Sequence, residues 1–355
     1  MGVYYFANQI YQLSYAWPIY QSMGGSFLVR KYKTYLKFKR YLKGCALKDR
    51  SMLFGTPRVQ KRDLKNLSDL EGVLVSQSNS RLHNDHAKSK SIFIGHGTGD
   101  KKYGGKAHTL ESYDYLFLSG PKHLEKLLDS GLRIPPHKLI KIGNIRFDQY
   151  INGLYSREKL MERMGIPHSS MSRKNVLYAP TWQWGNGTLN KYVRSFMKEI
   201  TREHNLIVRP HHFDAHLIPA LKTWALLNGV KNVYFSNPNN IRTNDTMQDF
   251  LVSDILISDT SSVLYEYLIT GKPIIVANTD FTGLHNMPSS MDIMSIAGFF
   301  HGFESILDVI NRSLSSRTGL SGYKEMLNAC FYFNDGHSVE RATDFIRNLE
   351  GSLVR

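Results

Sequence analysis

The chain contains short apolar runs that are separated by segments long enough to form helices. In most of these runs successive residues are apolar, without the alternation of a half-exposed strand, which is typical of parallel strands buried on both faces of a sheet. The intervening segments fit the crossover connections that parallel strands need. The pattern therefore predicts an α/β fold. The predicted strands are 51–55, 72–76, 91–95, 115–119, 139–143, 175–179, 205–209, 232–236, 254–258 and 273–277.

The strands fall into two series, which predict two αβα domains with parallel sheets. We expect an N-terminal domain at 51–150, a bridge at 151–172, a C-terminal domain at 173–335 and a last helix at 336–355. Ligands of such sheets bind at the carboxyl ends of the strands, and two domains predict a site in the cleft between them. The predicted helices are 121–130, 156–164, 190–203, 214–228, 260–270, 303–315 and 338–349.

Composition excludes several classes of protein. The 355 residues are 42% hydrophobic and 21% charged, which is ordinary for a globular protein and unlike a disordered chain. Two cysteines, Cys45 and Cys330, cannot form a disulfide framework and favour a reducing, cytosolic compartment. No apolar run reaches the roughly 18–20 residues of a spanning helix, and no secretory signal is expected.

The net charge of +15 is concentrated near the N-terminus. Residues 1–67 contain 13 Lys and Arg but only two acidic residues, so they carry +11. Residues 1–50, in which basic and aromatic residues alternate, are predicted as a helical segment on an anionic membrane surface. A solvated basic helix is the alternative. Nucleic-acid binding is disfavoured because no known nucleic-acid motif is present.

Candidate chemistry lies in the loops after the strands. His96 follows strand 91–95 in a glycine-rich loop, where it is a candidate general base, or it only hydrogen-bonds its own loop. Lys101 in the same loop could hold an anion. Arg146 and Asp148 follow strand 139–143 and either pair with each other or touch a substrate.

The second domain offers a candidate phosphate site. Arg209 and His211 follow strand 205–209, and the adjacent His211–His212 pair lacks the spacing of a zinc site. Asp259 ends strand 254–258, and Thr260, Ser261 and Ser262 then open a helix. Hydroxyls at a helix N-terminus can cradle a phosphate, or they only cap the helix. Glu266, one turn on, is placed to meet a ribose.

These motifs resemble the CDP-glycerol glycerophosphotransferase family, which includes teichoic acid primases and polymerases and related capsule enzymes. The resemblance rests on the order of HGTGDKK, GNIRFD, YAPTW, RPHH, SDILISDTSSVLYEYL, GKPII and FNDGHSVERATDFI, and it covers residues 70–350. It implies a GT-B fold, with two Rossmann-like domains and the nucleotide donor bound mainly by the second. The chain departs from the family pattern at Gly99 and Ile145, which replace prolines, and at Thr260, which replaces a tyrosine.

The resemblance also implies roles for residues. His96 matches the catalytic base and His211 the histidine at the donor phosphates. Lys101 and the Asp259-to-Ser262 block match donor-site positions, and Glu266 matches the acidic residue after that block. We expect Arg209, Thr181 and Thr260 to contact the donor phosphates as well, with Arg146, Asp148 and Asp259 in supporting places.

The implied reaction transfers glycerol phosphate, or a related polyol phosphate, from CDP-glycerol to a hydroxyl of a membrane-linked acceptor, with release of CMP. We expect a peripheral enzyme on the cytoplasmic face of the membrane that needs no cofactor, with Mg²⁺ at most stimulatory. Two alternatives remain at this stage. One is a GT-B glycosyltransferase or UDP-sugar 2-epimerase that uses another nucleotide-sugar donor. The other is a non-catalytic basic protein.

Overall fold

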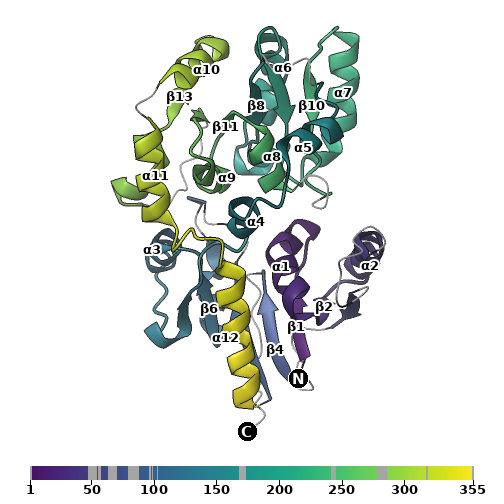
Figure 1. The fold of residues 1–355 in the computed structure, drawn as a ribbon, viewed down its shortest axis with the longest axis vertical. Coiled ribbons are helices and arrows are strands. Elements are labelled where there is room, and N and C mark those ends of the chain that lie inside the picture. Colours follow the sequence, from purple (N-terminus) through teal and green to yellow (C-terminus); the bar gives the residue numbers. More distant parts are fainter. Residues whose placement is uncertain are drawn as a thin grey trace. The chain divides into compact units, whose positions relative to one another are not determined.

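The structure, a computed structural model, is divided into two compact units. The first unit contains residues 1–96, 103–148 and 331–355, and the second contains residues 97–102 and 149–330. Each unit is described separately, and Figure 1 labels their elements. The structure describes residues 2–46, 54, 57–62, 70–78, 88–95, 97, 99–101, 103–167, 173–240, 245–278, 286–316 and 319–353.

The first unit contains a seven-stranded parallel sheet with the order β3-β2-β1-β4-β5-β6-β7. Each pairing is parallel, and Val3 of β1 lies opposite Val73 of β4. All five residues of β4 are buried, as expected for a central parallel strand. The strands are β1 (Gly2–Phe6), β2 (Ser26–Val29), β3 (Arg58–Lys61), β4 (Gly72–Ser76), β5 (Ser89–Phe93), β6 (Tyr115–Leu118) and β7 (Leu139–Lys141).

Helices cover this sheet, and α12 lies against β4 (Figure 1). The last helix therefore belongs to the first unit, although the sequence analysis placed it after the second domain. A core cluster that includes Phe6, Leu74, Phe93 and Tyr113 holds the layers together. The helices are α1 (Leu13–Met23), α2 (Tyr32–Ala46), the 3₁₀ helix η2 (Gly104–Ser112), α3 (Pro121–Asp129), α4 (Phe147–Ile151, which ends in the second unit) and α12 (Ser338–Leu353).

The N-terminal segment is part of this fold, so its prediction as a separate helical attachment is wrong. Strand β1 lies between β2 and β4. The ring of Tyr5 packs 5.1 Å from that of Phe27 and 6.1 Å from that of Tyr20, and all three side chains are buried. Aromatic residues that suggested a membrane interface are thus core residues. The predicted strand 51–55 lies outside the described residues except for Phe54, which is in a turn.

The second unit contains a six-stranded parallel sheet with the order β10-β9-β8-β11-β12-β13. This sheet confirms the second predicted series and adds β13, whose three residues were too few to be recognised. The two parallel-sheet units confirm the predicted fold class. The strands are β8 (Asn175–Tyr178), β9 (Asn205–Val208), β10 (Val233–Phe235), β11 (Ile255–Ser258), β12 (Ile274–Ala277) and β13 (Gly298–Phe300).

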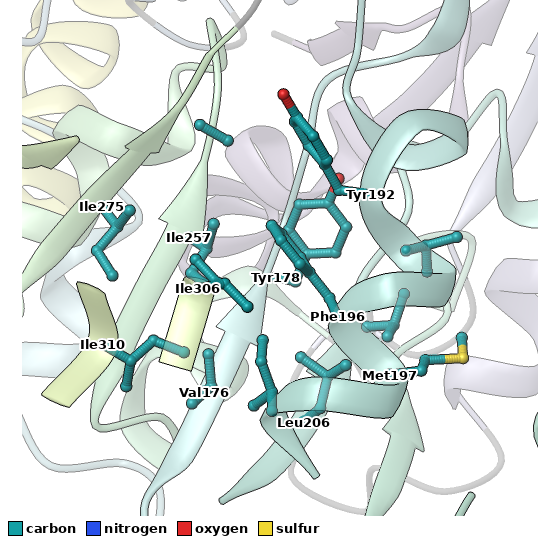
Figure 2. Close-up of a cluster of buried hydrophobic side chains, with 14 of the residues drawn as sticks. Val176, Tyr178, Tyr192, Phe196, Met197, Leu206, Ile257, Ile275, Ile306 and Ile310 are labelled. Carbon is teal, nitrogen blue, oxygen red and sulfur yellow. The ribbon is translucent and has the colours of Figure 1, made fainter. Parts of the chain in front are cut away.

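The core of the second unit lies between its sheet and helices α6 and α10. Figure 2 shows Phe196 of α6 beside Tyr178 of β8, in a buried cluster that also contains Met197 of α6 and Ile310 of α10. Truncation of such a buried phenylalanine to alanine typically costs about 3–5 kcal/mol. The helices are α5 (Arg157–Met164), α6 (Leu189–Ile200), α7 (Ile218–Leu227), α8 (Thr246–Val252), α9 (Val263–Glu266), the 3₁₀ helix η7 (Tyr267–Thr270), α10 (Ile306–Ser315) and α11 (Gly319–Cys330).

Among the residues that the structure describes, no helix combines the length and the apolar character needed to cross a bilayer.

Candidate functional site

Asp259, at the carboxyl end of β11, organises the loops of the second unit. Its Oδ1 accepts the backbone N–H groups of Thr181 at 2.8 Å and Thr260 at 2.7 Å. Its Oδ2 accepts the N–H and the hydroxyl of Thr188 at 2.9 and 3.0 Å. Burial raises the pKa of Asp259, while these hydrogen bonds stabilise its charged form. The carboxylate thus joins the loop after β8 to the loop after β11.

Lys101, in the segment 97–102 of the second unit, contacts the loop after β8. Its Nζ donates to Oγ1 of Thr181 and to the carbonyl oxygen of Gly185, both at 3.0 Å. A Cβ atom on Gly185 would lie 2.6 Å from this Nζ, so the glycine permits the close approach. Burial lowers the pKa of Lys101, and the charge of Asp259 opposes that shift. Lys101 thus lies close to Thr181 and Asp259 in the second unit.

His211 follows β9, with the ring of Trp182 6.3 Å away. Its Nδ1 accepts the backbone N–H of Phe213 at 3.4 Å, so the neutral ring carries its proton on Nε2. Burial is the main cause that lowers the pKa of His211 to about 3. The adjacent His212 and the charges of Lys101 and Arg209 act in the same direction. At neutral pH His211 is therefore an uncharged donor in a positive potential.

After burial, part of the lowering of the His211 pKa comes from the positive charges of Lys101 and Arg209. A positive potential opposes protonation of an imidazole and favours binding of an anion. The described residues include no group of three or more His, Cys, Asp or Glu side chains placed to hold a metal ion.

Arg209 lies one residue from the end of β9, but its guanidinium has a structural environment. Nη1 donates to Oδ2 of Asp249 at 2.6 Å and to Oγ of Ser236 at 2.8 Å, and Nη2 donates to Oγ1 of Thr246 at 3.0 Å. This buried ion pair ties β9 to α8 and to the end of β10. The sequence predicted a direct phosphate contact for Arg209. In the structure the guanidinium is held by these buried partners, and its charge lowers the pKa of His211.

The residues between β11 and α9 match the predicted anion cradle in their placement. The hydroxyl of Thr260 is buried and has no hydrogen-bond partner in the described part of the chain. Oγ of Ser261 accepts the backbone N–H of Val263 at 3.4 Å. Ser262 precedes α9, and a Cβ atom on Gly99 would lie 2.8 Å from the nitrogen of Ser262. Glu266 lies on α9 and is almost fully buried.

The predicted residues of the first unit have structural contacts. Nη1 of Arg146 donates to the hydroxyl of Tyr15 at 3.3 Å. Oδ2 of Asp148 accepts the backbone N–H of Val339 at 2.7 Å, in the first turn of α12, and burial raises the pKa of Asp148. Thus Asp148 caps α12, and the contact joins the GNIRFD segment to the FNDGHSVER segment. His96, the candidate base, lies outside the described residues.

Sequence reasoning missed several residues of the site. Thr188 gives two hydrogen bonds to Asp259, and Gly185 accommodates Lys101. Asp214 accepts the backbone N–H of Gln183 at 2.9 Å and so joins the loops after β8 and β9. The glycine-rich stretch WGNGT after YAPTW was the available signal for the first two. No such signal marked Asp214, because an aspartate after RPHHF is ordinary in a turn.

Comparison with known proteins identifies related sequences. The family described as CDP-Glycerol:Poly(glycerophosphate) glycerophosphotransferase matches residues 66–348, which is most of the chain. The teichoic acid glycerol-phosphate primase of Bacillus subtilis (strain 168) is 25% identical over 289 residues, covering 75% of this chain and 70% of the primase. The teichoic acid poly(glycerol phosphate) polymerase of Staphylococcus epidermidis is 26% identical over 169 residues, covering 45% of this chain but only 22% of the polymerase.

The fold has a counterpart among solved structures. The structure of the wall teichoic acid polymerase TagF is similar with a TM-score of 0.69 at 17% identity, covering 100% of this chain and 90% of that one. At this identity the similarity supports the fold alone. It agrees with the two Rossmann-like units that the strand series predicted.

Proposed function

Since the chain belongs to the CDP-glycerol:poly(glycerophosphate) glycerophosphotransferase family, we propose that it is a transferase acting in teichoic-acid-type synthesis. It would move glycerol phosphate from CDP-glycerol to a hydroxyl of a polyol-phosphate or saccharide acceptor and release CMP. The named relatives, a primase and a polymerase, support this activity, and one TagF structure was soaked with CDPG. The same family match favours this transferase over a sugar transferase or epimerase.

One observation carries the proposal: Lys101, the loop of Thr181 and the loop of His211 come together at the carboxyl ends of β8, β9 and β11. Lys101 and Arg209 lower the pKa of His211, so both cations act on the position of its ring. A nucleoside diphosphate ester carries its negative charge on two adjacent phosphates. Phosphoryl transfer requires mainly positioning and charge neutralisation from the protein, which this arrangement is suited to supply.

Several side chains of the second unit would contribute to binding of the donor. Nε2–H of neutral His211 would donate to a donor phosphate without the cost of burying a charged ring. The unpartnered hydroxyl of Thr260, with Ser261 and Ser262, would supply further donors. Thr181 and Asp259 would hold Lys101 and the loops in place, and Glu266 would bind the ribose hydroxyls.

The reaction we propose is a single in-line displacement. The acceptor oxygen attacks the β-phosphorus, its proton passes to His96, and the bond from the β-phosphorus to the bridging oxygen breaks. CMP leaves as a stabilised phosphate, so no strong general acid is needed. The assignment of His96 rests on the family resemblance, and its loop continues into Lys101 at the donor site.

We further propose that helix α2 binds an anionic membrane surface, which would bring the enzyme to a lipid-linked acceptor on the cytoplasmic face. Phe38 and Leu42 of α2 are buried, whereas Tyr32 and Leu36 are 61% and 47% exposed. The outward residues around them are basic, and such a face matches anionic headgroups. These exposed basic residues are Lys31, Lys33, Lys37, Lys39, Arg40 and Lys43.

The donor proposal is tested by offering the full chain CDP-glycerol, CDP-ribitol and a UDP-sugar in separate reactions, each with lipid-linked acceptors. Release of CMP from CDP-glycerol at a rate well above the other donors is expected. Preference for CDP-ribitol would keep the reaction class and change the transferred group. Turnover of the UDP-sugar alone would contradict the proposal.

A further inference from the structure

The segment that contains Lys101 is held by a second contact one residue earlier. Oδ2 of Asp100 accepts a hydrogen bond from the phenol of Tyr265 at 2.6 Å. Tyr265 lies on α9, its side chain is almost fully buried, and its oxygen also accepts the backbone N–H of Ile293 at 3.3 Å. Asp100 and Tyr265 are 165 residues apart in the sequence, so this hydrogen bond holds the segment of Asp100 against a distant part of the chain.

Three consecutive positions of this segment meet the same part of the second unit. Gly99 lies against the backbone of Ser262 at the start of α9, closely enough that a Cβ would lie 2.8 Å from the nitrogen. Asp100 accepts from Tyr265, and Lys101 reaches Thr181 and Gly185. The segment is therefore anchored on α9 by one residue and on the loop after β8 by the next.

We propose that Asp100 and Tyr265 form a latch that positions Lys101 at the donor-phosphate site. The proposal deepens the function proposed above and rests on it for the identity of the donor. Both residues act through Lys101 and are positioning residues rather than catalytic ones. The latch also makes the geometry of the anion site depend on Tyr265, which lies within SDILISDTSSVLYEYL but had been given no role.

The chemistry of the pair supports a firm anchor. A hydrogen bond from a neutral donor to a carboxylate is stronger than one between neutral groups, and a length of 2.6 Å is typical of this class. Burial and the charge of Asp100 raise the pKa of Tyr265, so the phenol remains protonated and keeps donating at any physiological pH. Removal of the hydroxyl alone keeps the aromatic ring and removes the hydrogen bonds with Asp100 and Ile293.

The test is Tyr265→Phe in the full chain, with two readouts. The first is the dissociation constant of CDP-glycerol in the absence of acceptor, which is expected to rise by roughly 10- to 150-fold, as for loss of a hydrogen bond to a charged group. The second is the titration of the His211 imidazole, followed by NMR. Because Lys101 helps to lower the pKa of His211, displacement of Lys101 raises that pKa. A merely structural role would not move this readout.

A matched control lies two residues along the chain. Tyr267 is also buried, and its hydroxyl lies 3.1 Å from Oγ of Ser253, away from the segment of Lys101. Tyr267→Phe is expected to leave both readouts near those of the unchanged protein. Asp100→Asn keeps the size and an acceptor oxygen, provides a second variant if Tyr265→Phe does not fold, and should shift both readouts in the same direction.

A double variant decides whether the latch acts through Lys101. If it does, Tyr265→Phe adds little to the loss of affinity caused by Lys101→Met, and both variants raise the pKa of His211. Independent, multiplicative effects with an unchanged His211 pKa would overturn the latch. If CDP-glycerol does not bind the unchanged protein, the proposed donor is wrong, but the His211 titration still decides whether Tyr265 positions Lys101.

Discussion

The carboxylate of Asp259 accepts the backbone N–H of Thr181 at 2.8 Å, across 78 residues of sequence. This bond places the hydroxyl of Thr181 where it accepts from Lys101 at 3.0 Å. A residue at the end of one strand thus sets the position of a cation carried by another segment. The donor site we propose depends on this chain of contacts.

Replacement of Asp259 by asparagine should destabilise the protein. An amide oxygen can accept only part of the four hydrogen bonds, and its NH₂ group then faces backbone N–H donors. We expect the free energy of unfolding to fall by roughly 2–4 kcal/mol in urea denaturation. Asp308→Asn, at an exposed position of α10, is the control and should change it little. Equal stability of the two variants would contradict the organising role of Asp259.

Two glycines in the loop after β8 should respond differently to a methyl group. A Cβ on Gly185 would meet two side-chain atoms at 2.6 Å, Nζ of Lys101 and Nε1 of Trp182, and side chains move aside more easily than backbone. Gly185→Ala should therefore weaken CDP-glycerol binding with little loss of stability. A Cβ on Gly187 would meet the carbonyl oxygen of Thr181 at 2.0 Å, so Gly187→Ala must displace backbone. Its melting temperature should drop markedly, and a reversed order of the two effects would refute this reading of the loop.

Donor binding should be accompanied by proton uptake at His211. In the protein without bound donor the pKa of His211 is about 3. The adjacent phosphates of the bound donor will raise this pKa by favouring the charged form of the ring. Calorimetry near pH 5, in two buffers of different ionisation enthalpy, should detect protons taken up with CDP-glycerol. His211→Asn should lose that uptake while retaining weaker binding. An uptake of the same size in His211→Asn would assign the proton to another group.

The same residue predicts a pH dependence of stability. The unfolded chain binds a proton to His211 below its ordinary pKa of 6.5, whereas the folded protein binds it only near pH 3. Between these values the unfolded state binds more protons, so the free energy of unfolding falls as the pH falls from 6.5 towards 3. The slope should be shallower in His211→Asn, as measured by urea denaturation at several pH values. An identical slope in both proteins would show that His211 does not resist protonation in the folded state.

The sequence predicted most of the strands and placed the candidate residues at strand ends, but it did not predict the contacts among them. Apolar runs such as GVLVS at β4 are unambiguous because a parallel strand is buried on both faces. Strand β1 was missed because tyrosines next to a basic region have two interpretations, and only packing on Phe27 distinguishes them. Arg209 was expected to contact a phosphate directly because its ion-pair partner Asp249 lies 40 residues further along the chain and belongs to no recognised motif.

The corrected position of β1 changes how membrane binding is tested. Deletion of residues 1–48 would remove two strands of the first sheet, so point substitutions on α2 are needed. Lys33→Glu, Lys37→Glu and Arg40→Glu together should weaken binding to vesicles that contain phosphatidylglycerol by about 100-fold or more, since each basic residue near such a surface contributes about 1 kcal/mol.

A control with the same change in net charge shows whether that effect is local. Lys191, Lys198 and Lys222 are exposed on α6 and α7 of the second unit, and their replacement by glutamate should leave vesicle binding largely intact. A similar loss in both triple variants would mean that the whole charge of the protein, rather than α2, determines binding.

The central claim is tested most directly by the mass of the acceptor after reaction with CDP-glycerol. A lipid-linked teichoic-acid acceptor should gain whole glycerol phosphate units, with one CMP released for each unit. His96→Ala should lower the rate of this gain by roughly 10²–10⁴-fold, as expected for loss of a general base. CMP release without any gain in acceptor mass, or no reaction with any glycerol-phosphate acceptor, would contradict the account.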